Sequence, residues 1–344
     1  MNDNKENICI VYSHTKIGDL IWQLPYIEAI SNYHNRKITL IVRERTQAKE
    51  ILFDLSYIDK VEYIEFRKGL YYWVDVFFLW KFYLTNKFTH VYLLDKISRP
   101  AIAAKFCKIK NIIGPGIGNQ KKWITNKNCL KNEHLKLNYS EQSQIFLKKN
   151  NIPIINLIPK IDIKIQRIKN IYPEIFFKHE KKIAFGVDST ELNKIWPEEY
   201  FAELAYLLHQ KGIADFFYLV CGKNNNKIAE KIISISKQNY FFNCSHLNLM
   251  GIIKVMKDSK LFIGNNSGPP NLSSAIGIKS FALISNSSVK ELKYSNIIPI
   301  TPENYDERFD VGVKKIGDNF VKSREEMKKL TVNRVIEVLE KNLK

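Results

Sequence analysis

Short apolar runs recur along the first part of the chain, separated by stretches with helical spacing. They are rich in β-branched and aromatic residues and occupy 8–12, 38–43, 61–66 and 90–95. Runs of this length and composition are typical of buried strands. Their alternation with helical stretches predicts a parallel sheet covered by helices.

The same pattern appears again later in the chain. The second series of runs occupies 182–188, 216–222, 261–266 and 280–285. Pro153, Pro159 and Pro173 interrupt the irregular stretch between the two series, which favours a domain boundary there. The sequence therefore predicts an α/β protein of two doubly wound, Rossmann-like domains. We expect them to span 1–160 and 161–320, followed by a helix over 321–344 that can pack back on the first domain.

Composition and charge narrow the classes of partner. Apolar residues make up 45% of the chain and charged residues 26%, which is typical of a globular protein. The formal charge of +18 favours attraction to nucleotides, anionic lipids or nucleic acids. A codon bias toward lysine is an alternative source of this charge. Since no nucleic-acid recognition motif is present, we expect no nucleic-acid partner.

Cysteine usage and the apolar runs point to the cytoplasm. The five cysteines are scattered and odd in number, unlike a disulfide framework. No long apolar stretch precedes the first run, so we expect neither a secretory signal nor an anchor. The aromatic segment 71–84 is shorter than a membrane span and carries Asp75 and Lys81. It is either a buried helix or a helix on the anionic cytoplasmic face of the inner membrane.

Three segments carry residues suited to chemistry at the ends of predicted strands. The first follows the opening strand and contains Gly18 and Asp19 before a helix. Ligands of open α/β sheets bind at the carboxyl ends of strands. Asp19 can therefore face a ligand, or it can cap the helix.

The second segment follows the run at 182–188. Ser189, Thr190 and Lys194 precede a helix that opens at Pro197. Hydroxyls, backbone amides and an ammonium before a helix start can receive phosphate oxygens. A plain polar loop with a helix cap is the alternative.

The third segment follows the run at 261–266. Asn266, Ser267 and Gly268 lie between this strand and a helix that begins near Pro270. Small residues let backbone amides approach a ligand, and the helix adds its positive end. The alternative is a turn that needs glycine for its geometry.

Taken in this order, the three segments resemble glycosyltransferase family 9, whose members include lipopolysaccharide heptosyltransferases. The matching residues are Gly18, Asp19, Leu24 and Pro25, then Ser189, Thr190, Lys194, Trp196 and Pro197, then Asn266, Ser267, Gly268 and Leu272. The resemblance implies the GT-B fold, in which two Rossmann-like domains face each other across a cleft. It assigns the acceptor to the first domain and the nucleotide sugar to the second.

The resemblance also implies the reaction and the site residues. An acceptor hydroxyl attacks the anomeric carbon of a nucleotide-diphosphate sugar, and the configuration inverts. The catalytic residues expected are Asp19, as base, and Lys194. The donor-binding residues expected are Gly18, Ser189, Thr190, Lys194, Gly222, Asn266, Ser267, Gly268 and Asn271. Since no Asp-x-Asp pair or metal-ligand spacing occurs, we expect no metal and no cofactor besides the donor.

Two positions depart from the family pattern. Asn266 stands where the family has Asp, and Asn271 stands where it has His. Asparagine keeps hydrogen-bonding capacity but loses the charge or the titratable ring. The donor therefore stays open, with ADP-linked sugars among the candidates.

The expected partners are a nucleotide sugar, a glycolipid or oligosaccharide acceptor of lipopolysaccharide type, and the anionic membrane surface. One alternative is a catalytically degenerate GT-B protein that binds a nucleotide or glycan. Another is a sugar-nucleotide epimerase, which shares the two-domain architecture.

Overall fold

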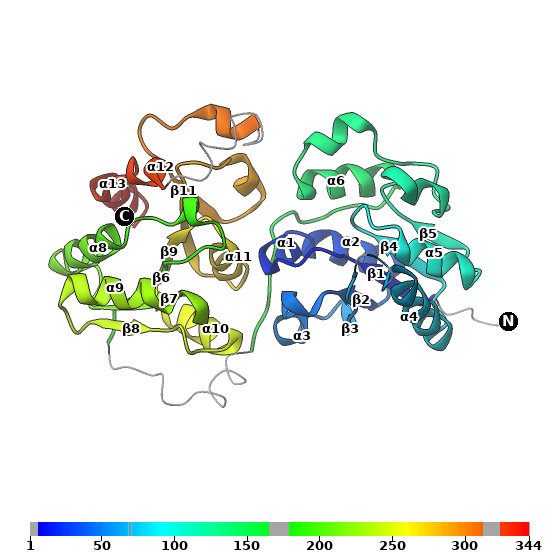
Figure 1. The fold of residues 1–344 in the computed structure, drawn as a ribbon, viewed down its shortest axis with the longest axis horizontal. Helices are drawn as coiled ribbons and strands as arrows, with labels where there is room; N and C mark the ends of the chain where they lie inside the picture. The colour runs from blue at the N-terminus through cyan, green and yellow to red at the C-terminus, as the bar shows by residue number, and fades with distance from the viewer. Residues whose placement is uncertain (1–5, 68, 70, 165–178, 312–323, 344) are drawn as a thin grey trace. The chain divides into compact units, whose positions relative to one another are not determined.

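The computed structural model describes residues 6–67, 69, 71–164, 179–311 and 324–343. The chain divides into two compact units, Met1–Asp162 and Ile163–Lys344. Each unit is built on one parallel β-sheet with helices packed on it (Figure 1).

The first unit has a five-stranded sheet in the order β3-β2-β1-β4-β5. Its strands are β1 (Ile8–Val11), β2 (Ile38–Val42), β3 (Ile58–Tyr63), β4 (His90–Leu93) and β5 (Asn111–Ile113). Its helices are α1 (Ile17–Ile21), α2 (Leu24–His34), α3 (Ala48–Ile51), α4 (Tyr71–Asn86), α5 (Arg99–Phe106) and α6 (Tyr139–Lys149). The first strand is central, with β2 on one side and β4 on the other. The strand order therefore reverses between β1 and β4.

Helix α4 shows how the aromatic segment 71–84 is used. Val76, Leu79 and Tyr83 pack into a core that also holds Cys9 and Val11 of β1. The other face carries exposed aromatic side chains. One face of the helix is therefore buried in the core, and the alternative of a helix on a membrane surface stays a prediction for the exposed face. The exposed apolar residues of α4 are Tyr71, Trp73, Val74, Phe77, Phe78 and Leu84. Among the described residues, no helix combines the length and apolar character that a membrane crossing requires.

The second unit has a six-stranded sheet in the order β11-β10-β9-β6-β7-β8. Its strands are β6 (Lys182–Gly186), β7 (Phe216–Val220), β8 (Phe241–Asn243), β9 (Leu261–Asn265), β10 (Lys279–Leu283) and β11 (Ile297–Ile300). Its helices are α8 (Glu198–Gln210), α9 (Asn226–Ser236), α10 (Leu249–Asp258), α11 (Gly268–Ala275), α12 (Glu325–Lys328) and α13 (Val332–Leu343). The order reverses between β6 and β9, as it does between β1 and β4 in the first unit.

Two glycines allow β6 and β9 to approach closely at this reversal. Gly186 and Gly264 are register partners in the parallel pair. A Cβ on Gly264 would lie 2.8 Å from the Cα and 2.8 Å from the carbonyl oxygen of Gly186. Glycine is therefore required by close approach here, not by backbone dihedrals.

The C-terminal helix packs inside the second unit. The buried face of α13 consists of Val332, Val335, Ile336 and Leu339, and the helix contacts α8 and β11. The option that this helix also packs on the first domain stays a prediction. Its apolar stripe is covered by elements of its own unit.

Candidate active site

The carboxyl ends of β1 and β4 are joined by one buried carboxylate. Asp95, which follows β4, accepts a hydrogen bond from the Ser13 amide at 2.5 Å and another from the Ile97 amide at 2.9 Å. Ligands of doubly wound sheets bind where the strand order reverses. Asp95 therefore fixes the loops at the point of the first sheet where a ligand is expected.

Gly18 and Asp19 lie next to this point, but inside the first turn of α1 and not in a loop before it. Asp19 therefore does not act as the N-cap, a position held by Lys16. The Asp19 carboxylate lies 3.6 Å from Nδ1 of His14, and about a third of its side chain (32%) is exposed. This carboxylate can be reached by a substrate.

Two tyrosines hold the ring of His14. Tyr12 stacks on it, with ring centroids 4.9 Å apart, and Tyr139 meets it edge-on at 4.3 Å. Burial, with the charges of Asp19 and Asp95 adding to it, raises the pKa of both phenols. Both hydroxyls therefore stay protonated at neutral pH beside the two carboxylates.

A pocket of about 400 Å³ opens beside His14 and is lined only by residues of the first unit. Its wall carries Lys96 and Arg99. Arg99 is held by an ion pair to the buried Asp75 at 2.6 Å and lies over the ring of Tyr72. Asp75 also pairs with Arg67 at 2.8 Å. The lining residues are Ser13, His14, Tyr72, Asp95, Lys96, Ile97, Ser98, Arg99, Ile117, Gly118, Asn119 and Gln120.

In the second unit, Asp188 gathers the ends of three strands. Its carboxylate accepts hydrogen bonds from the Gly222 amide at 2.7 Å and from the Asn225 side chain at 3.0 Å, both after β7. Its carbonyl oxygen accepts a hydrogen bond from the hydroxyl of Ser267, after β9. The amide of Gly222 thus already has a partner within the protein.

The loop after Asp188 places Ser189, Thr190 and Lys194 along this edge. Ser189 is buried and its hydroxyl accepts a hydrogen bond from the Glu191 amide, whereas Thr190 is exposed. The ammonium of Lys194 lies 3.1 Å from the Glu191 carboxylate and is 22% exposed. Lys194 therefore brings a positive charge to this edge of the sheet, and the Glu191 carboxylate partly neutralises it.

Trp196 fixes this loop to the rest of the unit. Its amide donates to Asn265 Oδ1 at 2.9 Å, and its indole N–H donates to the carbonyl of Leu330 at 2.8 Å. The side chain is fully buried. The Trp-Pro pair is thus a structural anchor, which ties the loop that carries Lys194 to Asn265 at the end of β9.

The start of α11 has fewer free backbone N–H donors than an ordinary helix start, because two prolines stand in its first turn. Ser267 is the N-cap, and Pro269 and Pro270 follow Gly268. Proline has no N–H, so the amides of Ser267 and Gly268 are the principal donors at this helix start.

The two asparagines that depart from the family pattern both have partners. Asn266 donates to the hydroxyl of Ser287 at 3.0 Å, and Asn271 donates to the carbonyl of Ser267 at 3.2 Å. The side-chain oxygen of Asn271, Oδ1, is buried without a hydrogen-bond partner. It is therefore an acceptor that a ligand donor can satisfy.

The structure gathers the predicted residues at two sheet edges. Gly18 and Asp19 lie at the first, and the others lie at the carboxyl edge of the second sheet. Residues not predicted from the sequence are His14 and Asp95 at the first edge, and Asn286 and Ser287 at the second. Asp95 is the last residue of the run at 90–95, and the other three stand one or two residues after the runs at 8–12 and 280–285. Position at the end of a strand is therefore the signal that could have found them.

Comparisons with known proteins agree on one family. The model of "glycosyltransferase family 9 (heptosyltransferase)" matches residues 76–305. A family 9 glycosyltransferase from Veillonella parvula is similar in structure, with a TM-score of 0.76 at 16% identity, covering 99% of this chain and 98% of that one. A search of curated protein sequences finds no significant match.

Two Escherichia coli structures are also similar. ADP-heptose lipopolysaccharide heptosyltransferase II has a TM-score of 0.72 at 15% identity, with 97% of this chain and 98% of that chain covered. Heptosyltransferase WaaC with ADP-2-deoxy-2-fluoro heptose has a TM-score of 0.70 at 15% identity, with 98% and 99% covered.

These similarities confirm the predicted GT-B fold and favour a transferase over an epimerase. The family model covers well over half of the chain. The chain therefore belongs to glycosyltransferase family 9.

Proposed function

We propose that this glycosyltransferase moves a heptose or related sugar from a nucleoside-diphosphate sugar to a glycan or glycolipid hydroxyl, with inversion at the anomeric carbon. ADP-linked donors are the first to test, because a similar structure carries an ADP-linked fluoroheptose. The observation that carries the proposal is the accessible Asp19 carboxylate beside His14, at the reversal point of the first sheet.

On the acceptor side, Asp19 is the general base. Its carboxylate takes the proton of the acceptor hydroxyl while the hydroxyl oxygen forms the new bond to the anomeric carbon. The bond from that carbon to the diphosphate oxygen breaks, and its electrons leave with the nucleoside diphosphate. His14 orients the Asp19 carboxylate, since its ring is held by Tyr12 and Tyr139.

On the donor side, the second unit stabilises the leaving diphosphate. Lys194 supplies positive charge, Ser189 and Thr190 supply hydroxyls, and the amides of Ser267 and Gly268 supply backbone donors. Charge develops on the diphosphate as the bond breaks, so fixed donors lower the barrier. This donor set requires no metal ion in the reaction.

The pocket beside His14 suits an anionic acceptor. Lys96 and Arg99 give its wall positive charge, and Asp75 and Tyr72 keep the guanidinium of Arg99 in place. We propose that this wall binds a carboxylate or phosphate of a lipopolysaccharide-type acceptor.

The exposed face of α4 suits contact with the lipid surface that carries such an acceptor. Trp73 is 61% exposed, and Phe77 and Phe78 are 55% and 53% exposed. Exposed Lys81 and Lys87 lie on or directly after the same helix. Aromatic side chains beside lysines favour binding at the interface of an anionic membrane, and on its cytoplasmic face in this proposal.

Release of nucleoside diphosphate from a panel of ADP-, UDP-, GDP- and CMP-linked sugars, with a glycan acceptor present, tests the transfer. We expect Asp19→Asn to fold normally and to lose transfer by roughly 100-fold or more. The matched control is Asp59→Asn, which removes an exposed carboxylate on β3 of the same unit. Normal turnover by Asp19→Asn would remove Asp19 from the role of base. Nucleotide-sugar binding without turnover by the unmodified protein would favour the degenerate binding protein.

Three further measurements separate the parts of the proposal. Transfer should persist in excess chelator, and a loss that Mg²⁺ restores would contradict the metal-free donor site. Lys96→Ala should raise KM for an anionic acceptor and leave the donor KM unchanged. Flotation with phosphatidylglycerol vesicles should fall when Trp73 and Phe77 are replaced by serine. Vesicle binding that changes neither with salt concentration nor with these substitutions would contradict the membrane contact.

A further inference from the structure

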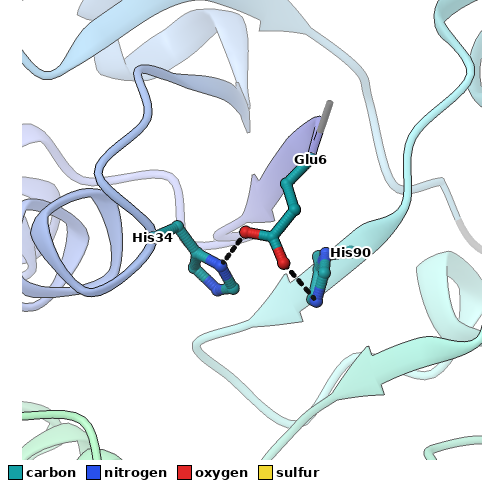
Figure 2. Close-up of side chains that lie close together, drawn as sticks. All are labelled: Glu6, His34 and His90. Atoms are coloured by element: carbon teal, nitrogen blue, oxygen red, sulfur yellow. Dashed lines mark hydrogen bonds and ion pairs between the residues drawn. The ribbon is translucent and has the colours of Figure 1, made fainter. Parts of the chain in front are cut away.

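Two histidines and one glutamate meet at the amino-terminal edge of the first sheet. Glu6 precedes β1, His34 ends α2 and His90 begins β4. Figure 2 shows the Glu6 carboxylate between the two imidazole rings. One Glu6 oxygen lies 2.8 Å from His34 Nδ1 and the other lies 3.9 Å from His90 Nε2. This edge is opposite the one that carries Asp19.

In each histidine, the ring nitrogen that faces away from Glu6 has its own hydrogen-bond partner. This partner can hold the proton on that nitrogen, so that the lone pair of the other nitrogen faces Glu6. His34 Nε2 lies 2.8 Å from the Tyr92 hydroxyl, so a proton on Nε2 leaves the Nδ1 lone pair facing Glu6. The Thr89 hydroxyl donates to the Asn7 carbonyl. Its oxygen can therefore accept a proton from His90 Nδ1 at 3.0 Å, which leaves Nε2 facing Glu6. Outer hydrogen bonds of this kind orient histidine ligands in metal sites.

One carboxylate oxygen of Glu6 and one ring nitrogen from each histidine lie close enough together to share an ion. The atoms all lie within 4.8 Å of one another. A tetrahedral Zn²⁺ with ligands at about 2.1 Å holds its ligand atoms roughly 3.4 Å apart. The 2.8 and 3.9 Å separations involve different Glu6 oxygens, so small side-chain rotations would bring one oxygen and the two ring nitrogens onto one ion.

We propose that Glu6, His34 and His90 bind one Zn²⁺-type divalent ion, with water completing the coordination. Two imidazoles and a carboxylate form a ligand set that zinc favours over magnesium or calcium. The ion would join the approach to β1, the end of α2 and the start of β4. Its role is to stabilise the first unit, because the transfer site lies at the other edge of the sheet.

The test uses the full-length, tag-free protein after treatment with chelator and dialysis. Co²⁺ is added while the visible d–d bands are recorded, and Zn²⁺ is then added to displace it. We expect one Co²⁺ per chain, displacement by one Zn²⁺, and a higher melting temperature with Zn²⁺ present. Glu6→Gln and His90→Gln should each weaken binding by roughly tenfold or more.

His246→Ala is the matched control, because it removes an exposed imidazole in the second unit. It should bind Co²⁺ as the unmodified protein does. Both ligand variants keep a polar side chain at their position, and Glu6 is exposed, so a melting curve in chelator verifies that each is folded. Absence of one-to-one binding, or equal affinity in both ligand variants and the unmodified protein, would overturn the site.

Discussion

Replacing Gly264 by alanine tests the close approach of β6 and β9. The new Cβ would lie 2.8 Å from two backbone atoms of Gly186 and 2.8 Å from the ring of Phe262. Backbone cannot yield as a flexible side chain does, so the two strands must separate. Overpacking of this kind costs about 2 kcal/mol. For a unit of this size we expect the melting temperature to fall by roughly 4–8 °C.

Gly222→Ala is the matched control for this prediction. A Cβ at Gly222 would meet only the Asp188 carboxylate, at 3.5 Å, and the residue has a φ of −74° that alanine adopts readily. Its stability should stay within about 0.5 kcal/mol of the unmodified protein. Thermal unfolding followed by circular dichroism measures both variants. Equal melting temperatures for Gly264→Ala and the unmodified protein would refute the steric reasoning.

Three further predictions concern buried groups near the two sheet edges. Tyr12→Phe should raise stability to urea by about 1 kcal/mol, since the Tyr12 hydroxyl is buried without a hydrogen-bond partner; a loss of stability would contradict this. Trp196→Phe should cost about 2–3 kcal/mol in the same assay, because it empties volume and leaves the Leu330 carbonyl without its donor; a neutral result would argue against the anchor. Burial, with Asp188 nearby, raises the pKa of Cys221 to about 12. Its thiol should resist iodoacetamide at pH 8 while the less buried Cys129 reacts first, as peptide mass mapping would show.

Apolar runs made the central strands and one edge strand, β3, predictable, whereas the other three edge strands were missed. Every run named in the sequence contains all or most of a strand in the structure, except 61–66, which contains the second half of β3. β5, β8 and β11 were missed, and each lies at the edge of its sheet. β5 and β8 have three residues and β11 has four. So few residues give little periodic signal, and pairing with a neighbouring strand decides their conformation.

The residues of the candidate site were predictable where they lie in the segment between a strand and the next helix, or in the first turn of that helix. Position after an apolar run pointed to Asp19, Ser189 and Ser267. The sequence could not show that Asp19 lies within a helical turn beside His14, because that contact depends on how α1 folds back on the loop before it. Their roles in transfer remain predictions.

The residues that the sequence did not predict are brought together by contacts between segments far apart in the chain. Asp95 bonds to the Ser13 amide 82 positions away, and Glu6 meets His34 at a separation of 28. Neither spacing matches a metal or catalytic motif. The parallel pairing of β1 with β4 brings Asp95 to the Ser13 amide, and His34 reaches Glu6 from the end of α2.

The hydrogen bond between Trp196 and Leu330 spans 134 positions, and Arg324 donates to the carbonyls of Ile195 and Trp196. The last helices of the chain thus support the loop that carries Lys194. Shortening the protein from its C-terminal end would therefore disturb the loop of Lys194 without removing any residue of the proposed donor site. An affinity tag is better placed so that this end stays free to fold against its own unit.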